Sequence, residues 1–179
     1  MPGIPGAALT QLVPASELAS GQAAGIRNEV VKFLLGLVSF ELKLTADRLV
    51  VRDILAATDL DYSTEEWGEV TGTTTGAYET MTTGTVGTDR WIGIFGVKLA
   101  EGAGACTALK FNVGGGDRAI WQLQSLNEED GYVGFSPSPV ILPQNQPYTI
   151  SRYVKAISSP FFCVLKGVVV EPRGKLISP

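Results

Sequence analysis

The chain has 179 residues and a net charge of −4, with lysine and arginine scattered singly, which excludes direct nucleic-acid binding as its main task. Its length fits one domain that buries roughly two thirds of its unfolded surface, so folding needs neither a disulfide framework nor a structural metal. Hydrophobic residues make up 45% and charged residues only 18%, a balance that predicts apolar surface covered by other protein chains, with a large core as the alternative.

Residues 1–25 form a predicted N-terminal arm, and residues 26–179 form the predicted folded domain. The arm begins MPGIPGAALTQLVPA, where proline fixes its own φ and removes a backbone donor, so this part is expected to be extended. It is also too apolar for an ordinary solvated tail. We therefore expect the arm to lie on a neighbouring chain or on the body of its own domain.

Neither export nor membrane insertion is expected. The first residues lack the positive charge that precedes the apolar core of a secretory signal. The most apolar stretch, VVKFLLGLVSF, contains a lysine and is shorter than the roughly 20 apolar residues that span a bilayer.

The first element of the domain is a predicted short helix over 26–35, with Gly36 as its stop. The period then changes to two, which predicts a strand over 40–45 and a returning strand over 49–55, paired as a hairpin. Two alternatives stay open because periodicity does not settle short apolar runs. One is a buried strand over 30–38, and the other is a single helix over 26–55.

The rest of the chain is rich in threonine and glycine, with turn residues at short intervals. This spacing predicts a mainly β fold, an antiparallel β-sandwich or jelly roll with an extended N-terminal arm and one short helix. The turns expected between the strands include those at 127–130 and 137–139. The predicted strands are 67–71, 77–82, 90–99, 108–113, 119–126, 131–135, 140–142, 148–155 and 161–170.

Groups suited to catalysis or cofactor binding are sparse, and we expect no enzyme activity, cofactor or metal. Without histidine the usual general base and the commonest metal ligand are missing. The run Gly114 to Asp117 lacks the rest of a phosphate loop and predicts a tight turn. Two acidic clusters lack the spacing of a calcium loop and are expected to be solvated. They comprise Asp59, Asp61, Glu65, Glu66 and Glu69, and Glu128, Glu129 and Asp130.

The two cysteines, Cys106 and Cys163, stand among small or apolar residues. That setting predicts a pair of thiols in the core, with a single disulfide as the alternative.

Seven aromatic residues are candidates for a sugar-stacking platform or for a core or subunit interface. They are Trp67, Trp91, Trp121, Tyr132, Phe135, Tyr148 and Tyr153. Trp121 shares a strand face with Leu123, which favours core or interface. The expected interface residues combine the apolar residues of the arm with two tryptophans, namely Ile4, Leu9, Leu12, Val13, Trp67 and Trp91.

Four segments carry a resemblance to known proteins. Three lie in the carboxy-terminal third, FSPSPVILP at 135–143, QPYTIS at 146–151 and GVVVEPRGK at 167–175, and the fourth is VVRDIL at 50–55. Together with the region after Trp67 they resemble the capsid cement and decoration proteins of tailed bacteriophages, which have a jelly-roll domain. The resemblance implies a homo-oligomer, such as a trimer on a capsid lattice, bound to the major capsid protein or other virion proteins. It also implies synthesis in the host cytoplasm and a place in the virion.

Three functions follow as hypotheses. The leading one is a virion structural protein, a cement, decoration or minor capsid subunit that stabilises the particle through protein–protein contacts. The alternative is a carbohydrate-binding jelly-roll module of a tail or receptor-binding fibre. A carboxylate-dependent hydrolase is the weakest, because no catalytic spacing is recognisable.

Overall fold

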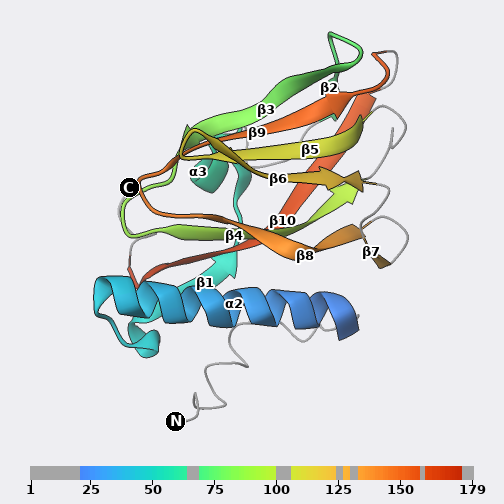
Figure 1. The fold of residues 1–179 in the computed structure, drawn as a ribbon. Coiled ribbons are helices and arrows are strands. Elements are labelled where there is room, and N and C mark those ends of the chain that lie inside the picture. Colours follow the sequence, from blue (N-terminus) through green and yellow to red (C-terminus); the bar gives the residue numbers. More distant parts are fainter. Residues whose placement is uncertain are drawn as a thin grey trace.

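A computed structural model describes residues 21–63, 69–99, 106–123, 127–129, 133–157 and 160–174. These residues form three layers: helix α2, a sheet built around strand β10, and a second sheet on the far side (Figure 1). The elements are α2 (Gly21–Leu42), η2 (Ala46–Arg48), β1 (Leu49–Asp53), α3 (Ala56–Leu60), β2 (Glu69–Thr71), β3 (Ala77–Thr85), β4 (Trp91–Leu99), β5 (Cys106–Val113), β6 (Gly116–Gln122), β7 (Asn127–Glu129), β8 (Val133–Leu142), β9 (Pro147–Val154) and β10 (Pro160–Pro172).

All strand pairs are antiparallel, and the predicted mainly β sandwich is confirmed. One sheet has the order β1-β10-β4-β8-β7, with β2 also paired to β10, and the other has the order β3-β9-β5-β6. The predicted arm lies outside the described residues except for 21–25, which belong to α2.

The main core lies between the two sheets, where the alternating inward residues of both sheets meet. Trp121 from β6 packs against Phe111 from β5, with the ring centroids 4.6 Å apart. Trp121 and Leu123 are both buried in this core, as their shared strand face predicts. Phe111, Leu109 and Ile150 fill the same layer.

A second core holds α2 against the other face of the β10 sheet. Gly93 on β4 makes the close approach possible, because a Cβ there would stand 2.6 Å from Val30 of the helix. Adding even one methyl at this contact would force the side chains of Val30 and Leu34 to shift. The buried residues of this core are Val30, Val31, Leu34, Leu35, Val38, Leu49, Trp91, Phe95, Val168 and Val170.

The N-terminal part of the domain differs most from its prediction. The helix is longer than predicted and runs through Gly36 to Leu42, so the strand over 40–45 and its hairpin are wrong. The alternatives of a strand over 30–38 and a helix over 26–55 are also wrong. The predicted return strand exists as β1, but it pairs with β10 instead of its neighbour in sequence. Contact with the sheet selects the helix where the local pattern is ambiguous.

The predicted turn at 137–139 is also wrong, because β8 continues through it. Val140 still pairs with Ile94, but the next pair on β4 is Gly96 with Phe135. The intervening prolines therefore fall where the ladder is interrupted, and their missing N–H groups break no regular pairing. The turn predicted at 127–130 is instead the short strand β7, which pairs with β8.

The cysteine prediction is confirmed, since Cys106 and Cys163 are free and buried in the main core. Burial raises the pKa of Cys106 to about 11 and also raises the pKa of Cys163. Because the thiolate is the reactive form, we expect neither thiol to react with Ellman's reagent at mildly alkaline pH while the protein is folded. Both should react in denaturant. Fast labelling of the native protein would contradict the burial of these thiols.

Glu79 on β3 anchors the turn that leads into this strand. Its carboxylate accepts hydrogen bonds from the Thr73 hydroxyl at 2.7 Å and from the Thr73 and Thr74 amides at 2.6 Å each. Arg152 on β9 adds an ion pair at 3.2 Å. The Thr73 hydroxyl, the two amides and Arg152 together lower the pKa of Glu79 from 4.5 to about 2.

A carboxylate whose pKa is lowered in the folded protein stabilises the fold at pH values above its pKa in the unfolded chain. This stabilisation is lost as the pH falls through the pKa of the folded protein. We therefore expect Glu79→Gln to be less stable than wild type at neutral pH. The difference should shrink as the pH is lowered from 4.5 to about 2. Denaturation midpoints of both proteins across this range measure it. A difference that is constant with pH would contradict the ionised anchor.

Candidate functional site

Helix α2 also carries exposed apolar side chains beside the face that packs on the sheet. Phe33 is 58% exposed and Phe40 72% exposed, and Leu37 between them is half-buried because it also packs against the second core. These residues are four and three apart, so they lie on one side of the helix. We call Phe33, Leu37 and Phe40 the outer stripe.

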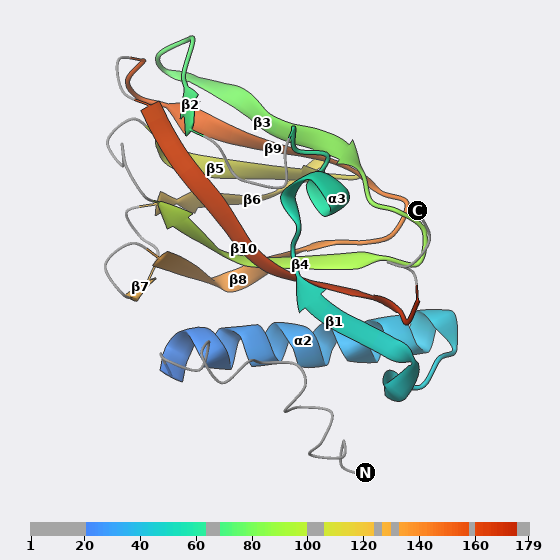
Figure 2. The same ribbon diagram turned by 180° about the vertical axis from the view of Figure 1, so that it is seen from behind.

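The outer stripe lies on the outside of the molecule. Both views show α2 running along the outer face of the β10 sheet, opposite the sheet that contains β3 and β9 (Figures 1 and 2). Among the described residues, no element covers the stripe. Large apolar side chains that stay exposed next to one another on a helix surface often mark a contact with another protein.

Charged side chains border the outer stripe. Glu29 and Lys32 form an ion pair at 2.9 Å on the exposed surface of the helix. The Lys43 ammonium lies 4.4 Å from the centre of the Phe40 ring, a cation–π contact that covers only part of the ring. An apolar centre with a polar rim is the usual anatomy of a protein–protein contact.

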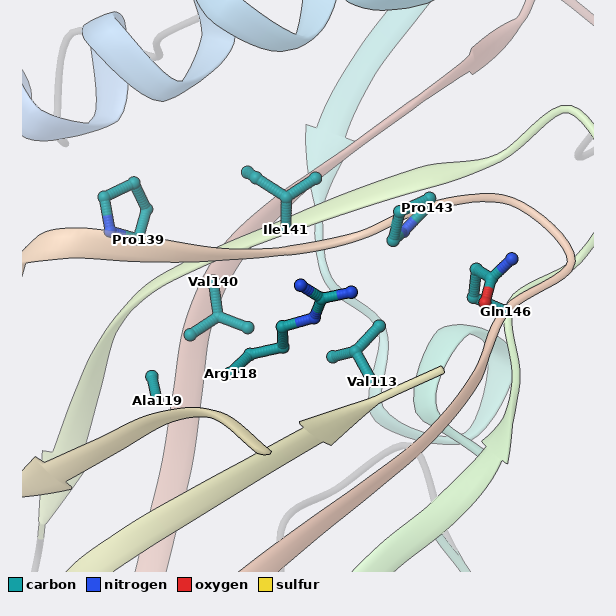
Figure 3. A pocket seen from close by; sticks show the side chains of 8 residues that line it. All are labelled: Val113, Arg118, Ala119, Pro139, Val140, Ile141, Pro143 and Gln146. Carbon is teal, nitrogen blue, oxygen red and sulfur yellow. The ribbon is translucent and has the colours of Figure 1, made fainter. Parts of the chain in front are cut away.

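A second feature is an open cavity of about 630 Å³ at the side of the sandwich. It lies between the β5–β6 hairpin and the end of β8 (Figure 3). Six of its eight lining residues are apolar, but polar atoms supply almost half of the exposed lining, and its polar side chains are those of Arg118 and Gln146. The lining residues are Val113, Arg118, Ala119, Pro139, Val140, Ile141, Pro143 and Gln146.

A third feature is a buried network of two carboxylates and two arginines. Arg52 binds Asp59 through two bonds of 2.6 and 2.7 Å and Glu171 at 2.9 Å. Arg90 binds Glu171 at 2.8 Å and Asp59 at 3.1 Å. The Leu55 amide also donates to Asp59 at 2.7 Å. The network ties β1, α3 and the end of β10 together.

This network is poorly suited to catalysis. Both carboxylates are almost completely buried, and every one of their oxygens accepts a hydrogen bond from an arginine. Burial lowers the pKa of Arg52, but its bonds to Asp59 and Glu171 outweigh this effect and raise the pKa overall. Carboxylates held in this way are not available as a general base. The prediction of a solvated acidic loop is therefore wrong for Asp59, whereas Asp61 is exposed.

The sequence-predicted interface residues are placed only in part. Trp91 is 1% exposed and lies in the contact between α2 and β4, inside the chain. The other five, Ile4, Leu9, Leu12, Val13 and Trp67, lie outside the described residues. Of the aromatic candidates that the structure describes, Trp91, Trp121 and Tyr148 are buried, and Tyr153 packs edge-on against Tyr78 with the ring centroids 5.2 Å apart. Trp67, Tyr132 and the side chain of Phe135 lie outside the described residues.

The remaining predicted sites are turns or acidic groups. Gly114 and Gly115 have positive φ in the turn between β5 and β6, so the tight turn is confirmed. Glu65, Glu66, Asp130 and the side chains of Glu69, Glu128 and Glu129 lie outside the described residues.

The outer stripe is not apparent from the sequence, because the predicted short helix over 26–35 ends before Leu37 and Phe40 falls in the predicted strand over 40–45. The available signal is that Phe33, Leu37 and Phe40 are spaced by four and three residues, which places them on one side of a longer helix.

No cluster of three or more potential metal ligands occurs in the part of the chain that the structure describes. Within the same residues, no helix has the length and apolar character needed to cross a bilayer. Comparisons with protein-family models, curated proteins and solved structures find no match for this chain.

Proposed function

We propose that this chain is a virion structural protein, a cement, decoration or minor capsid subunit of a tailed bacteriophage that stabilises the particle through protein–protein contacts. The observation that carries the proposal is the outer stripe of α2, an apolar surface on a chain whose described residues already form two hydrophobic cores. The expected partners are other copies of the chain, the major capsid protein or other virion proteins.

The energetics suit an assembly of many copies. Fully burying a phenylalanine side chain contributes roughly 1.5–3 kcal/mol. Phe33 and Phe40 together therefore supply only a modest contact for one subunit, after the cost of association. On a lattice the same contact repeats, and simultaneous contacts strengthen one another.

The body of the protein suits a passive structural role. The two sheets and α2 enclose continuous cores, and the buried ions of Arg52, Asp59, Arg90 and Glu171 fasten the end of β10. A stiff body keeps a contact surface in a fixed geometry, which lowers the entropy lost on docking.

Quantitative mass spectrometry of the purified source particle tests this function. The proposal expects the chain in a fixed, high copy number that survives extensive washing. Native mass spectrometry of the isolated chain should then show self-association or binding to capsids. A chain absent from particles, monomeric at all concentrations and without affinity for capsids or tails would refute the proposal.

A further inference from the structure

The cavity beside β6 contains a feature that assembly does not explain. Ala119 pairs with Phe111, but Asp117 pairs with Asn112, so Arg118 is the extra residue of a β-bulge. Neighbouring residues of a regular strand point to opposite faces. Arg118 and Ala119 nevertheless both line the cavity, because a bulge redirects a side chain.

Arg118 enters the cavity without an ionic partner of its own among the described residues. The nearby carboxylate, Asp117, already accepts a bond from Asn112 at 3.2 Å and lies 3.8 Å from the Lys110 ammonium. Figure 3 shows the Arg118 side chain reaching from β6 across the opening towards β8. The open cavity thus presents one exposed guanidinium that has no ion pair among the described residues, beside the apolar side chains of Val113 and Val140.

The walls define what fits beside this cation. Val113 and Val140 form a buried apolar floor, with Pro143 at the rim. Gln146 adds an amide at the mouth, packed over Gly114, where a Cβ would stand 2.9 Å from the Gln146 oxygen. The volume of about 630 Å³ lies within the range of roughly 300–1,000 Å³ that is typical of ligand sites, and apolar side chains stand beside the two polar ones.

We propose that this cavity binds a single carboxylate carried on an apolar body. The planar fork of an arginine matches a carboxylate through two parallel hydrogen bonds. One cation balances one negative charge, whereas a phosphate dianion would leave charge uncompensated against apolar walls. The carboxylate belongs either to a small organic acid or to an acidic residue of a protein segment.

The alternative role for a charged bulge is to keep the edge strand β6 from pairing with another sheet. Protection of the edge requires an arginine on β6, but it requires neither a cavity nor an amide at the mouth of the cavity. A measurement of ligand binding therefore distinguishes a ligand site from protection of the edge.

Amide NMR titrations of the full chain with hexanoate and its neutral analogue hexanamide test the proposal. Hexanoate should cause saturable shifts at Ala119, Val140 and Gln146. Hexanamide should bind more weakly by a factor of about ten or more, because it lacks the charge-assisted bonds. Equal binding of the two compounds, or shifts elsewhere on the protein, would overturn the proposal.

Two variants and a control make the test specific. Arg118→Gln should weaken hexanoate binding by about ten-fold or more, and Arg118→Lys should have an intermediate effect because it keeps the charge but not the fork. Arg173→Gln removes the same charge from another exposed position and should bind hexanoate like wild type. The amide spectra show directly whether each variant is folded. Unchanged affinity in Arg118→Gln would mean that Arg118 only protects the edge.

A further titration with a peptide distinguishes the two sources of the carboxylate. The hexapeptide TEEWGE, with the sequence of residues 64–69, carries glutamates beside a tryptophan. Binding tighter than hexanoate, with the same loss in Arg118→Gln, would assign the site to a protein segment. Binding of hexanoate alone would assign it to a small acid. Absence of binding by both probes would refute the site and leave the proposed structural function untouched.

Discussion

Replacing Glu171 by glutamine is expected to lower the free energy of unfolding by about 3–5 kcal/mol, the range for breaking one member of a buried ion pair. Glu171 is 1% exposed and neutralises two cations, Arg52 at 2.9 Å and Arg90 at 2.8 Å. Glutamine keeps the shape but removes the charge, so both guanidinium groups share Asp59 alone. Chemical denaturation followed by tryptophan fluorescence measures the loss.

Glu41→Gln is the matched control, because Glu41 is exposed near the end of α2. Its effect should stay within about 0.5 kcal/mol, as for most surface substitutions. If Glu171→Gln were equally mild, the four charges would not be acting as a buried unit. Replacing the whole network by apolar residues of similar volume should cost less than the single substitution, because no unpaired charge remains.

The double substitution Phe33→Glu with Phe40→Glu is expected to abolish association while leaving the fold intact. Both side chains are exposed, so their loss opens no cavity, and glutamate forms helices well. Two negative charges at the centre of an apolar contact would have to be buried without partners. Sedimentation velocity and incorporation into particles measure association, and thermal unfolding checks the fold.

Ile157→Glu provides the control, since Ile157 is also exposed but lies outside α2, after β9. It should associate like wild type. Loss of association in the control as well would point to general charge repulsion. Normal assembly of the double variant would contradict a role for the outer stripe.

Much of the sandwich is predictable because local sequence patterns identify its strands. β-branched residues between turn residues predict 90–99, 148–155 and 161–170, close to the observed β4, β9 and β10. These strands are central or long, and their turn signals agree with the tertiary structure. The buried Trp121 follows from the same alternation.

The parts that escape prediction depend on contacts between distant residues. The segment after Gly36 alternates like a strand, but packing against the sheet makes it helical. β8 passes through two prolines because a break in its pairing with β4 accommodates them. Neither effect is visible in a local window.

The candidate site cannot be predicted from local sequence patterns for the same reason. The ionic network joins residues 52, 59, 90 and 171 from separate elements, so no spacing reveals it. The bulge at Arg118 depends on its pairing with β5. Predicting the outer stripe requires knowing which side of α2 packs against the sheet.

The most direct test of the central claim is photo-crosslinking within the assembled particle. With p-benzoylphenylalanine in place of Phe33, irradiation should join this chain to another chain, and the same probe at Ile157 should give much less product. Particles that incorporate the Phe33 variant normally yet show no crosslink from it to any other chain would contradict the claim that the outer face of α2 is a protein contact.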